Sequence, residues 1–88
     1  MLETTVCTFD VNVPYDEWVK KFDLDEAPAS SAKGIKVIFR GVSKDTPEKA
    51  IVVVQALAGV LGKNIQAHIE IFEKNGAVMS TAEPSLWS

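Results

Sequence analysis

The sequence is poor in the residues that hold very small domains together or that perform chemistry. It contains one cysteine, one histidine and one arginine in 88 residues. The single cysteine, Cys7, cannot form an internal disulfide, and no ligand spacing typical of zinc sites occurs. Glycine-rich phosphate loops and nucleophile elbows are also missing. We therefore expect neither a disulfide scaffold nor a metal-stabilised fold, and we predict that the protein has no cofactor.

Positive charge is scarce as well. Nine lysine and arginine residues stand against twelve acidic residues, so the net charge is -3, and there is no run of basic residues. Proteins that bind nucleic acid displace counterions from phosphate with a stripe of basic side chains. Nucleic acid is therefore not an expected partner, and an anionic membrane surface is disfavoured for the same reason.

Long apolar segments are absent too. A helix needs about 20 apolar residues to cross a bilayer, and the sequence has no such run. The segment Met1–Thr5 lacks the basic and apolar regions of a secretory signal. We expect a soluble, cytoplasmic protein that does not bind membranes.

The residues that are present suffice for one domain, predicted to span residues 1–88. Hydrophobic residues make up 47% of the chain, which is typical of globular proteins. A chain this short is near the lower limit for a self-sufficient core. Because disulfides and zinc clusters are lacking, association with a second copy is the remaining common way to enlarge such a core.

The most informative stretch runs from Ile35 to Leu57. Within it, the segment Ile51–Val54 is apolar at every position. A strand with one exposed face alternates apolar and polar side chains, so a continuous apolar run predicts a central strand covered on both faces. Pro47 favours a turn just before this run. The stretch therefore predicts a β-hairpin.

Around this hairpin, the pattern predicts two further strands and two main helices. Apolar residues recur at helical spacing after Pro14 and again after Gly59. Pro28 is expected to interrupt the first helix, and Pro84 marks the last strand as an edge strand. The predicted elements are a strand at 3–11, a helix from 14, a short helix ending at Gly34, strands at 35–42 and 50–57, a helix at 59–75 and a strand at 77–87.

The order of these elements, βαββαβ, predicts an α+β fold. Two antiparallel βαβ halves give a ferredoxin-like, four-stranded sheet with strand order 4-1-3-2 and both helices on one face. Because the helices cover only one face, we predict that the other face pairs with a second copy. The residues predicted at this homodimer interface are Ile38, Arg40, Val42, Val52 and Val54.

A small-ligand pocket is predicted between the helices and the sheet, with residues 25–33 near its mouth. Leu61, His68 and Phe72 share one face of the second helix at helical spacing. The lone histidine is either a hydrogen-bonded residue in a partly buried position or a functional base or iron ligand. The candidate pocket residues are His68, Trp18, Phe72 and Leu61, and no catalytic residue is assigned.

Several segments resemble a small family of uncharacterised cyanobacterial proteins. The segments are Pro14–Trp18, Glu26–Pro28, Gly34–Asp45 and Ser85–Trp87, and the resemblance covers nearly the whole chain. The family has no established activity, so the resemblance implies no catalytic residues. More distantly, the order of elements resembles the dimeric α+β barrel group, which includes cofactor-independent monooxygenases and haem-degrading enzymes.

This second resemblance implies a homodimeric barrel and leaves three functions open. The first is a non-catalytic or small-ligand-binding dimer. The second is a cofactor-independent oxygenase that acts on a small aromatic substrate with His68 and Trp18. The third is haem binding through His68, although haem-degrading members also use a strand-one asparagine and a helix-two tryptophan. Here the first asparagine is Asn12, and the second helix has no tryptophan.

Overall fold

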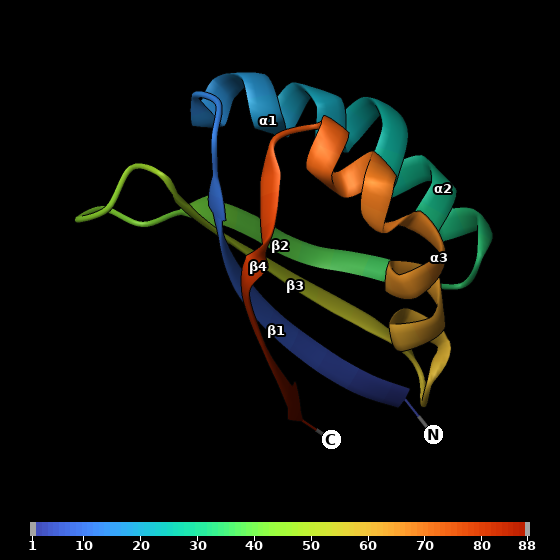
Figure 1. The fold of residues 1–88 in the computed structure, drawn as a ribbon. Helices are drawn as coiled ribbons and strands as arrows, with labels where there is room; N and C mark the ends of the chain where they lie inside the picture. The colour runs from blue at the N-terminus through green and yellow to red at the C-terminus, as the bar shows by residue number, and fades with distance from the viewer. Residues whose placement is uncertain (1, 88) are drawn as a thin grey trace.

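A computed structural model describes residues 2–87 and shows one antiparallel sheet with all helices on one side (Figure 1). In chain order the elements are β1 (Leu2–Val11), α1 (Tyr15–Lys21), the π-helical turn η1 (Phe22–Glu26), α2 (Ala27–Ala32), β2 (Lys36–Val42), β3 (Lys49–Leu57), α3 (Val60–Lys74) and β4 (Ala77–Trp87). The sheet order is β2-β3-β1-β4, with every neighbouring pair antiparallel. This is the predicted order 4-1-3-2 read from the other edge, so the α+β class and the sheet order are confirmed.

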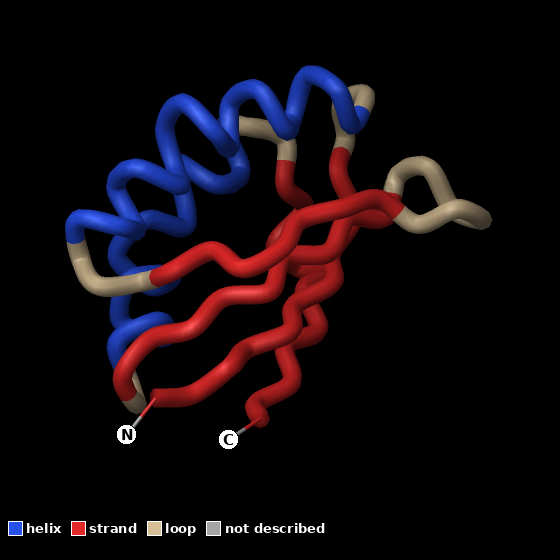
Figure 2. The backbone as a smooth tube through the Cα atoms, turned by 180° about the vertical axis from the view of Figure 1, so that it is seen from behind, coloured by secondary structure: helices blue, strands red, loops and turns tan. Residues whose placement is uncertain are grey.

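β3 lies inside the sheet, between β1 and β2, as its apolar run predicts. Every second residue from Ala50 to Ala56 is buried on the side that carries the helices. Ile51 and Val53 point to the other side, here called the open face, which no described element covers (Figure 2). The predicted position of Val52 and Val54 opposite the helices is therefore wrong. When a strand is apolar at every position, its sequence does not show which set of alternate residues faces the helices.

A β-bulge in β2 changes the face of three further side chains. Val37 and Phe39 pair with consecutive residues of β3, so Ile38 is an extra residue in the strand. Beyond the bulge, Phe39 lies on the open face, whereas Arg40 and Val42 pair with β3 residues that face the helices. The predicted placement of Arg40 and Val42 away from the helices is therefore wrong, because the bulge breaks the regular alternation of the strand. Ile38 itself is exposed at the bulge.

The interruption predicted at Pro28 takes the form of a widened turn rather than a break. Proline lacks an N–H and its ring clashes with the preceding turn of a regular α-helix. In η1 the amide of Ala27 donates a hydrogen bond to the carbonyl oxygen of Phe22, five residues earlier. Pro28 then lies in the first turn of α2, where its missing N–H is not required. The helical run from α1 to α2 is therefore continuous.

Trp18 lies at the centre of the packing between this helical run and the sheet. Its side chain is 1% exposed. Its ring stacks on Phe22 with centroids 5.0 Å apart, meets the edge of Phe9 at 5.5 Å and lies 5.7 Å from Tyr15. Aromatic pairs in this range contribute beyond the area that they bury. These contacts join α1 and η1 to β1.

α3 occupies the predicted range, with Gly59 before its first residue and Asn75 after its last. Gly59 has a φ of 84°, a left-handed conformation that glycine adopts without strain. The helix is kinked at His68, whose φ of -127° and ψ of 20° are not helical. α3 packs against β3 and β4. Within residues 2–87, none of the helices has the length and apolar character needed to cross a membrane.

Candidate functional site

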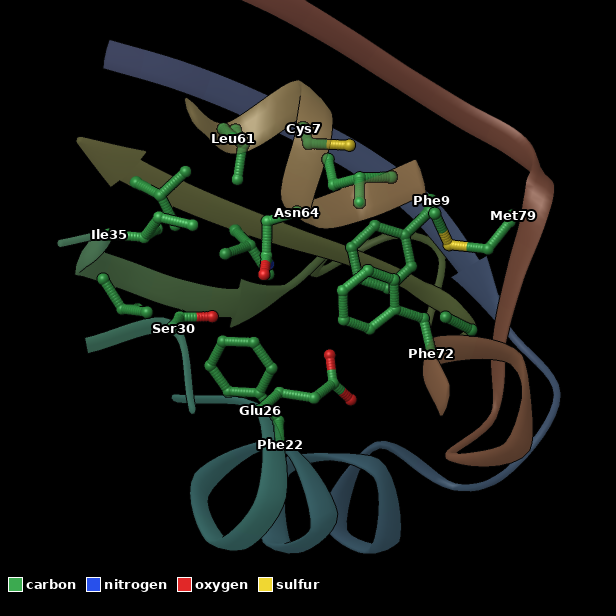
Figure 3. Close-up of a pocket in the computed structure, with 15 residues that line it drawn as sticks. Cys7, Phe9, Phe22, Glu26, Ser30, Ile35, Leu61, Asn64, Phe72 and Met79 are labelled. Atoms are coloured by element: carbon green, nitrogen blue, oxygen red, sulfur yellow. The ribbon is translucent and has the colours of Figure 1, made fainter. Parts of the chain in front are cut away.

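A cavity of about 90 Å³ lies between the helices and the sheet (Figure 3). All four strands contribute to its floor through their helix-facing side chains, and η1, α2 and α3 form the remaining walls. Most of the lining side chains are apolar. They include the aromatic rings of Phe9, Phe22 and Phe72 together with Leu61 and Met79. The cavity is thus hydrophobic, and few polar side chains line it.

The π-helical turn directs two of its side chains into this cavity. Phe22 and Glu26 are both buried and both line the cavity, whereas Asp23, Leu24 and Asp25 between them are exposed. π-helical turns are uncommon and occur frequently at functional sites. In this chain the turn brings a carboxyl group under the helix layer.

Glu26 is held in place by one hydrogen bond. Its side chain is 9% exposed, and Nδ2 of Asn75 donates a hydrogen bond of 3.0 Å to its Oε2 atom. Within residues 2–87, Oε1 accepts no hydrogen bond. Burial raises the pKa of Glu26 to about 7, against the opposing effect of the Asn75 hydrogen bond, and the nearby charge of Asp25 adds to the rise. A carboxyl group with this pKa exchanges a proton near neutral pH.

Two more polar side chains line the cavity, Asn64 from α3 and Ser30 from α2. Asn64 is 9% exposed, and its amide is not hydrogen bonded to any other residue of the described chain. Figure 3 shows the side-chain oxygens of Ser30, Asn64 and Glu26 turned into the cavity. Within residues 2–87, the one fully enclosed side-chain polar atom without a partner is Trp18 Nε1, so these cavity-facing atoms remain accessible. Accessible polar atoms on an apolar wall indicate a place for water or for a ligand.

Leu61 and Phe72 are the two predicted pocket residues that line the cavity. Trp18 is not in the wall, because aromatic rings surround it in the core. Its indole N–H is buried and has no acceptor within residues 2–87. An unpaired buried donor costs about 1–3 kcal/mol. The packing of the Trp18 ring therefore has to outweigh this cost.

His68 is not in the cavity wall either, so its prediction as the polar wall of the pocket is wrong. It is half-buried, and the ammonium of Lys33 donates a hydrogen bond to its Nε2 atom. Helical spacing places residue 68 beside residues 61, 65 and 72 only in a straight helix, and the kink is centred on His68 itself. The oxygenase and haem functions, which relied on His68 in the pocket, lose that support.

Arg40, a predicted interface residue, is bound within the chain. Its Nε atom donates to Oδ1 of Asp23 at 2.7 Å and its Nη2 atom donates to Oδ2 at 2.6 Å. The hydrogen bond from Arg40 lowers the pKa of Asp23. Both side chains are more than one third exposed, so the pair contributes at most about 1 kcal/mol. The pair links β2 to η1 on the helix side of the sheet.

The open face carries apolar side chains from all four strands. Val6, Phe39, Val53 and Trp87 lie on it, and Phe39 and Trp87 are 56% and 63% exposed. The ring of Phe39 covers Gly41, where a Cβ atom would lie only 3.0 Å from it. The open face is therefore an extended surface on which apolar side chains lie among polar ones such as Thr4, Gln55 and Glu83.

Glu26 and Asn64 were not among the predicted pocket residues, although the sequence carries a signal for both. Glu26 lies four residues after Phe22 and so extends the apolar stripe of the first helix. Asn64 lies three residues after Leu61 on the stripe of the second helix. The available signal was a polar residue on an apolar helical stripe. For Glu26 this signal was obscured, because Pro28 predicts that the first helix is interrupted near that position.

The fold and the cavity define a class of protein: a small antiparallel α+β domain with an apolar pocket and, among the described residues 2–87, a single buried carboxylic acid. The chain belongs to the family described as Domain of unknown function (DUF3764), which it matches over residues 2–88. No curated protein and no solved structure matches it significantly. The predicted membership of an uncharacterised family is confirmed, so function has to be argued from the cavity and the surface.

Proposed function

We propose that this protein binds a small, mainly apolar molecule in the cavity between its helices and its sheet. The observation that carries the proposal is the set of three polar side chains, Glu26, Asn64 and Ser30, on an otherwise apolar wall. Small-molecule sites have this composition, because apolar walls supply affinity and a few polar groups fix orientation. The cavity volume of about 90 Å³ admits about four non-hydrogen atoms, since a cavity of about 150 Å³ accepts the six of benzene. A longer ligand extends through the mouth.

Binding is favoured over catalysis by the partner of Glu26. Acid–base sites usually pair a titratable group with a second group that orients it and shares its proton. The partner here is the amide of Asn75, which does not exchange protons at neutral pH, and His68 lies outside the cavity. Glu26 is thus equipped to hold a ligand rather than to relay a proton.

A fragment screen monitored by two-dimensional NMR tests the proposal. Binding in the cavity should shift the signals of Leu61, Phe72 and Met79 together. Leu61→Trp should fill the cavity and weaken binding at least tenfold, whereas Ile71→Trp, at an exposed position of the same helix, should leave binding unchanged. Shifts that are scattered over the surface, or that persist in Leu61→Trp, would contradict the proposal.

We also propose that this ferredoxin-like domain forms a homodimeric α+β barrel through the open face. Strands of about nine residues, spaced about 4.8 Å apart, make a face of roughly 30 by 19 Å. Two such faces bury more than about 1,000 Å², which is enough for a specific interface. Val53 and Phe39 lie on this face, and polar pairs such as Gln55 with Thr4 accompany them. Val52 and Val54 are excluded from this interface because the helices cover them.

A further inference from the structure

We propose that the cavity selects ligands with a primary ammonium group on a short apolar chain, and that Glu26, Asn64 and Ser30 bind the ammonium. This inference rests on the proposed function, because it names the ligand class for the same cavity. Three features support it: the charge of the wall, the number of acceptor atoms, and the aromatic rings around them.

The charge of the wall favours a cation. Glu26 and Cys7 are the two ionisable side chains that line the cavity within residues 2–87. Burial raises the pKa of Cys7, so its thiol is neutral at pH 7. Among the described residues, the charge available in the wall is therefore negative. An anionic ligand would be repelled by it, whereas a cation would relieve the cost of keeping an ionised carboxylate under the helices.

The acceptor atoms match an ammonium group in number. A primary ammonium has three N–H donors and no acceptor. The cavity offers the uncommitted Oε1 of Glu26, the amide oxygen of Asn64 and the hydroxyl of Ser30, all turned into the same space (Figure 3). Asn75 holds the second carboxylate oxygen of Glu26 and so fixes the direction of the first. Hydrogen bonds to an ionised group are about twice as strong as neutral ones.

Aromatic rings complete the surroundings of the carboxylate. Phe9, Phe22 and Phe72 all line the cavity with Glu26. The face of an aromatic ring attracts a cation, and the attraction grows when water is excluded. The apolar side chains of the sheet floor are suited to the hydrocarbon part of the ligand. The wall therefore has a place for each end of an alkylammonium ion.

Binding of a cation should be coupled to the ionisation of Glu26. Asp25 is the neighbouring charge on the same segment and Cys7 is the titratable group facing the cavity from β1, while α2 and α3 contribute Ser30 and Asn64, which do not titrate. Since the pKa of Glu26 is about 7 without ligand, an ammonium ligand should bind more weakly below pH 7. The decrease approaches tenfold per pH unit.

Titration of the full chain with n-butylamine, n-butanol and butyrate, followed by NMR, tests the inference. At pH 8 the amine should bind at least tenfold more tightly than the alcohol, and butyrate should not bind. The affinity for the amine should fall about tenfold between pH 8 and pH 6. Glu26→Gln should abolish both the preference for the amine and its pH dependence. Glu70→Gln, which removes an exposed carboxylate of α3, should change neither.

The possible failures are distinguishable. If the alcohol binds as tightly as the amine at pH 8, or if Glu26→Gln keeps the preference, the ammonium inference is overturned while ligand binding in the cavity stands. If none of the three compounds shifts the cavity signals, the inference is overturned and the proposed function fails with it. The comparison of amine with alcohol uses the unmodified chain, so it does not depend on the folding of any variant.

Discussion

Replacing Glu26 by glutamine should remove most of the pH dependence of stability between pH 4.5 and 7. In the unfolded chain Glu26 ionises near the ordinary pKa of 4.5, whereas in the folded chain its pKa is about 7. Between these values the folded state keeps a proton that the unfolded state has lost. The free energy of unfolding should therefore fall as the pH rises from about 4.5 to about 7 and stay constant above that.

The magnitude follows from the burial of the side chain. The difference between the two pKa values corresponds to about 3 kcal/mol, as an order of magnitude, and a side chain that is 9% exposed is little screened by solvent. Glutamine retains an oxygen that can accept the hydrogen bond from Asn75 and carries no charge. Glu26→Gln should accordingly be more stable than the natural chain by up to about 3 kcal/mol at pH 7.5 and nearly equal to it at pH 4.5.

Urea unfolding followed by tryptophan fluorescence at four pH values from 4.5 to 7.5 measures this difference. The range lies above the protonation of Asp23, whose pKa is lowered, and below the ionisation of Cys7, whose pKa is raised. Glu70→Gln is the control, because it removes a carboxylate that is exposed. A natural chain with constant stability over this range, or a Glu26→Gln curve parallel to it, would refute the burial argument.

Further substitutions test the core and the open face. Trp18→Ala should lower the free energy of unfolding by about 3–5 kcal/mol, because it leaves a cavity among Phe9 and Phe22. Trp18→Phe should cost much less, since it also removes the unpaired indole N–H. A small loss of stability for Trp18→Ala in urea unfolding would mean that the ring is not packed as described. Light scattering at micromolar concentration should give twice the chain mass of 9.6 kDa, and Val53→Asp should give a monomer because an unpaired charge would be desolvated at the interface. Ile71→Asp, at an exposed position of α3, should remain dimeric, and a monomeric natural chain would exclude the proposed dimer.

Local signals in the sequence were sufficient for the order and limits of most elements. α3 begins after Gly59 and ends before Asn75. Gly59 and Gly76 both have a positive φ, which does not continue a right-handed helix. Pro84 lies in an edge strand because it has no N–H to donate to a further neighbour. The strand order follows from such signals together with the rules for connecting strands. Each of these features depends on a few residues that are close in the sequence.

The faces of β2 and β3 depended on tertiary pairing. Val52 and Val53 are equally apolar, so composition does not tell which one the helices cover. The bulge at Ile38 arises only when β2 is paired with β3, and it reverses the side to which Phe39 and Arg40 point. The ion pair of Arg40 with η1 is a consequence of that reversal.

The cavity was decided in the same way, by where the two helical runs depart from ideal geometry. A regular stripe on α3 predicts His68 in the wall, but the kink at His68 takes its side chain away from the cavity. Pro28 predicts an interruption of the first helix, but the π-helical turn continues the helix and buries the carboxyl group of Glu26. Sequence periodicity assumes that a helix is straight and uniform. Packing against the sheet determined where these two helical runs depart from a straight, uniform helix.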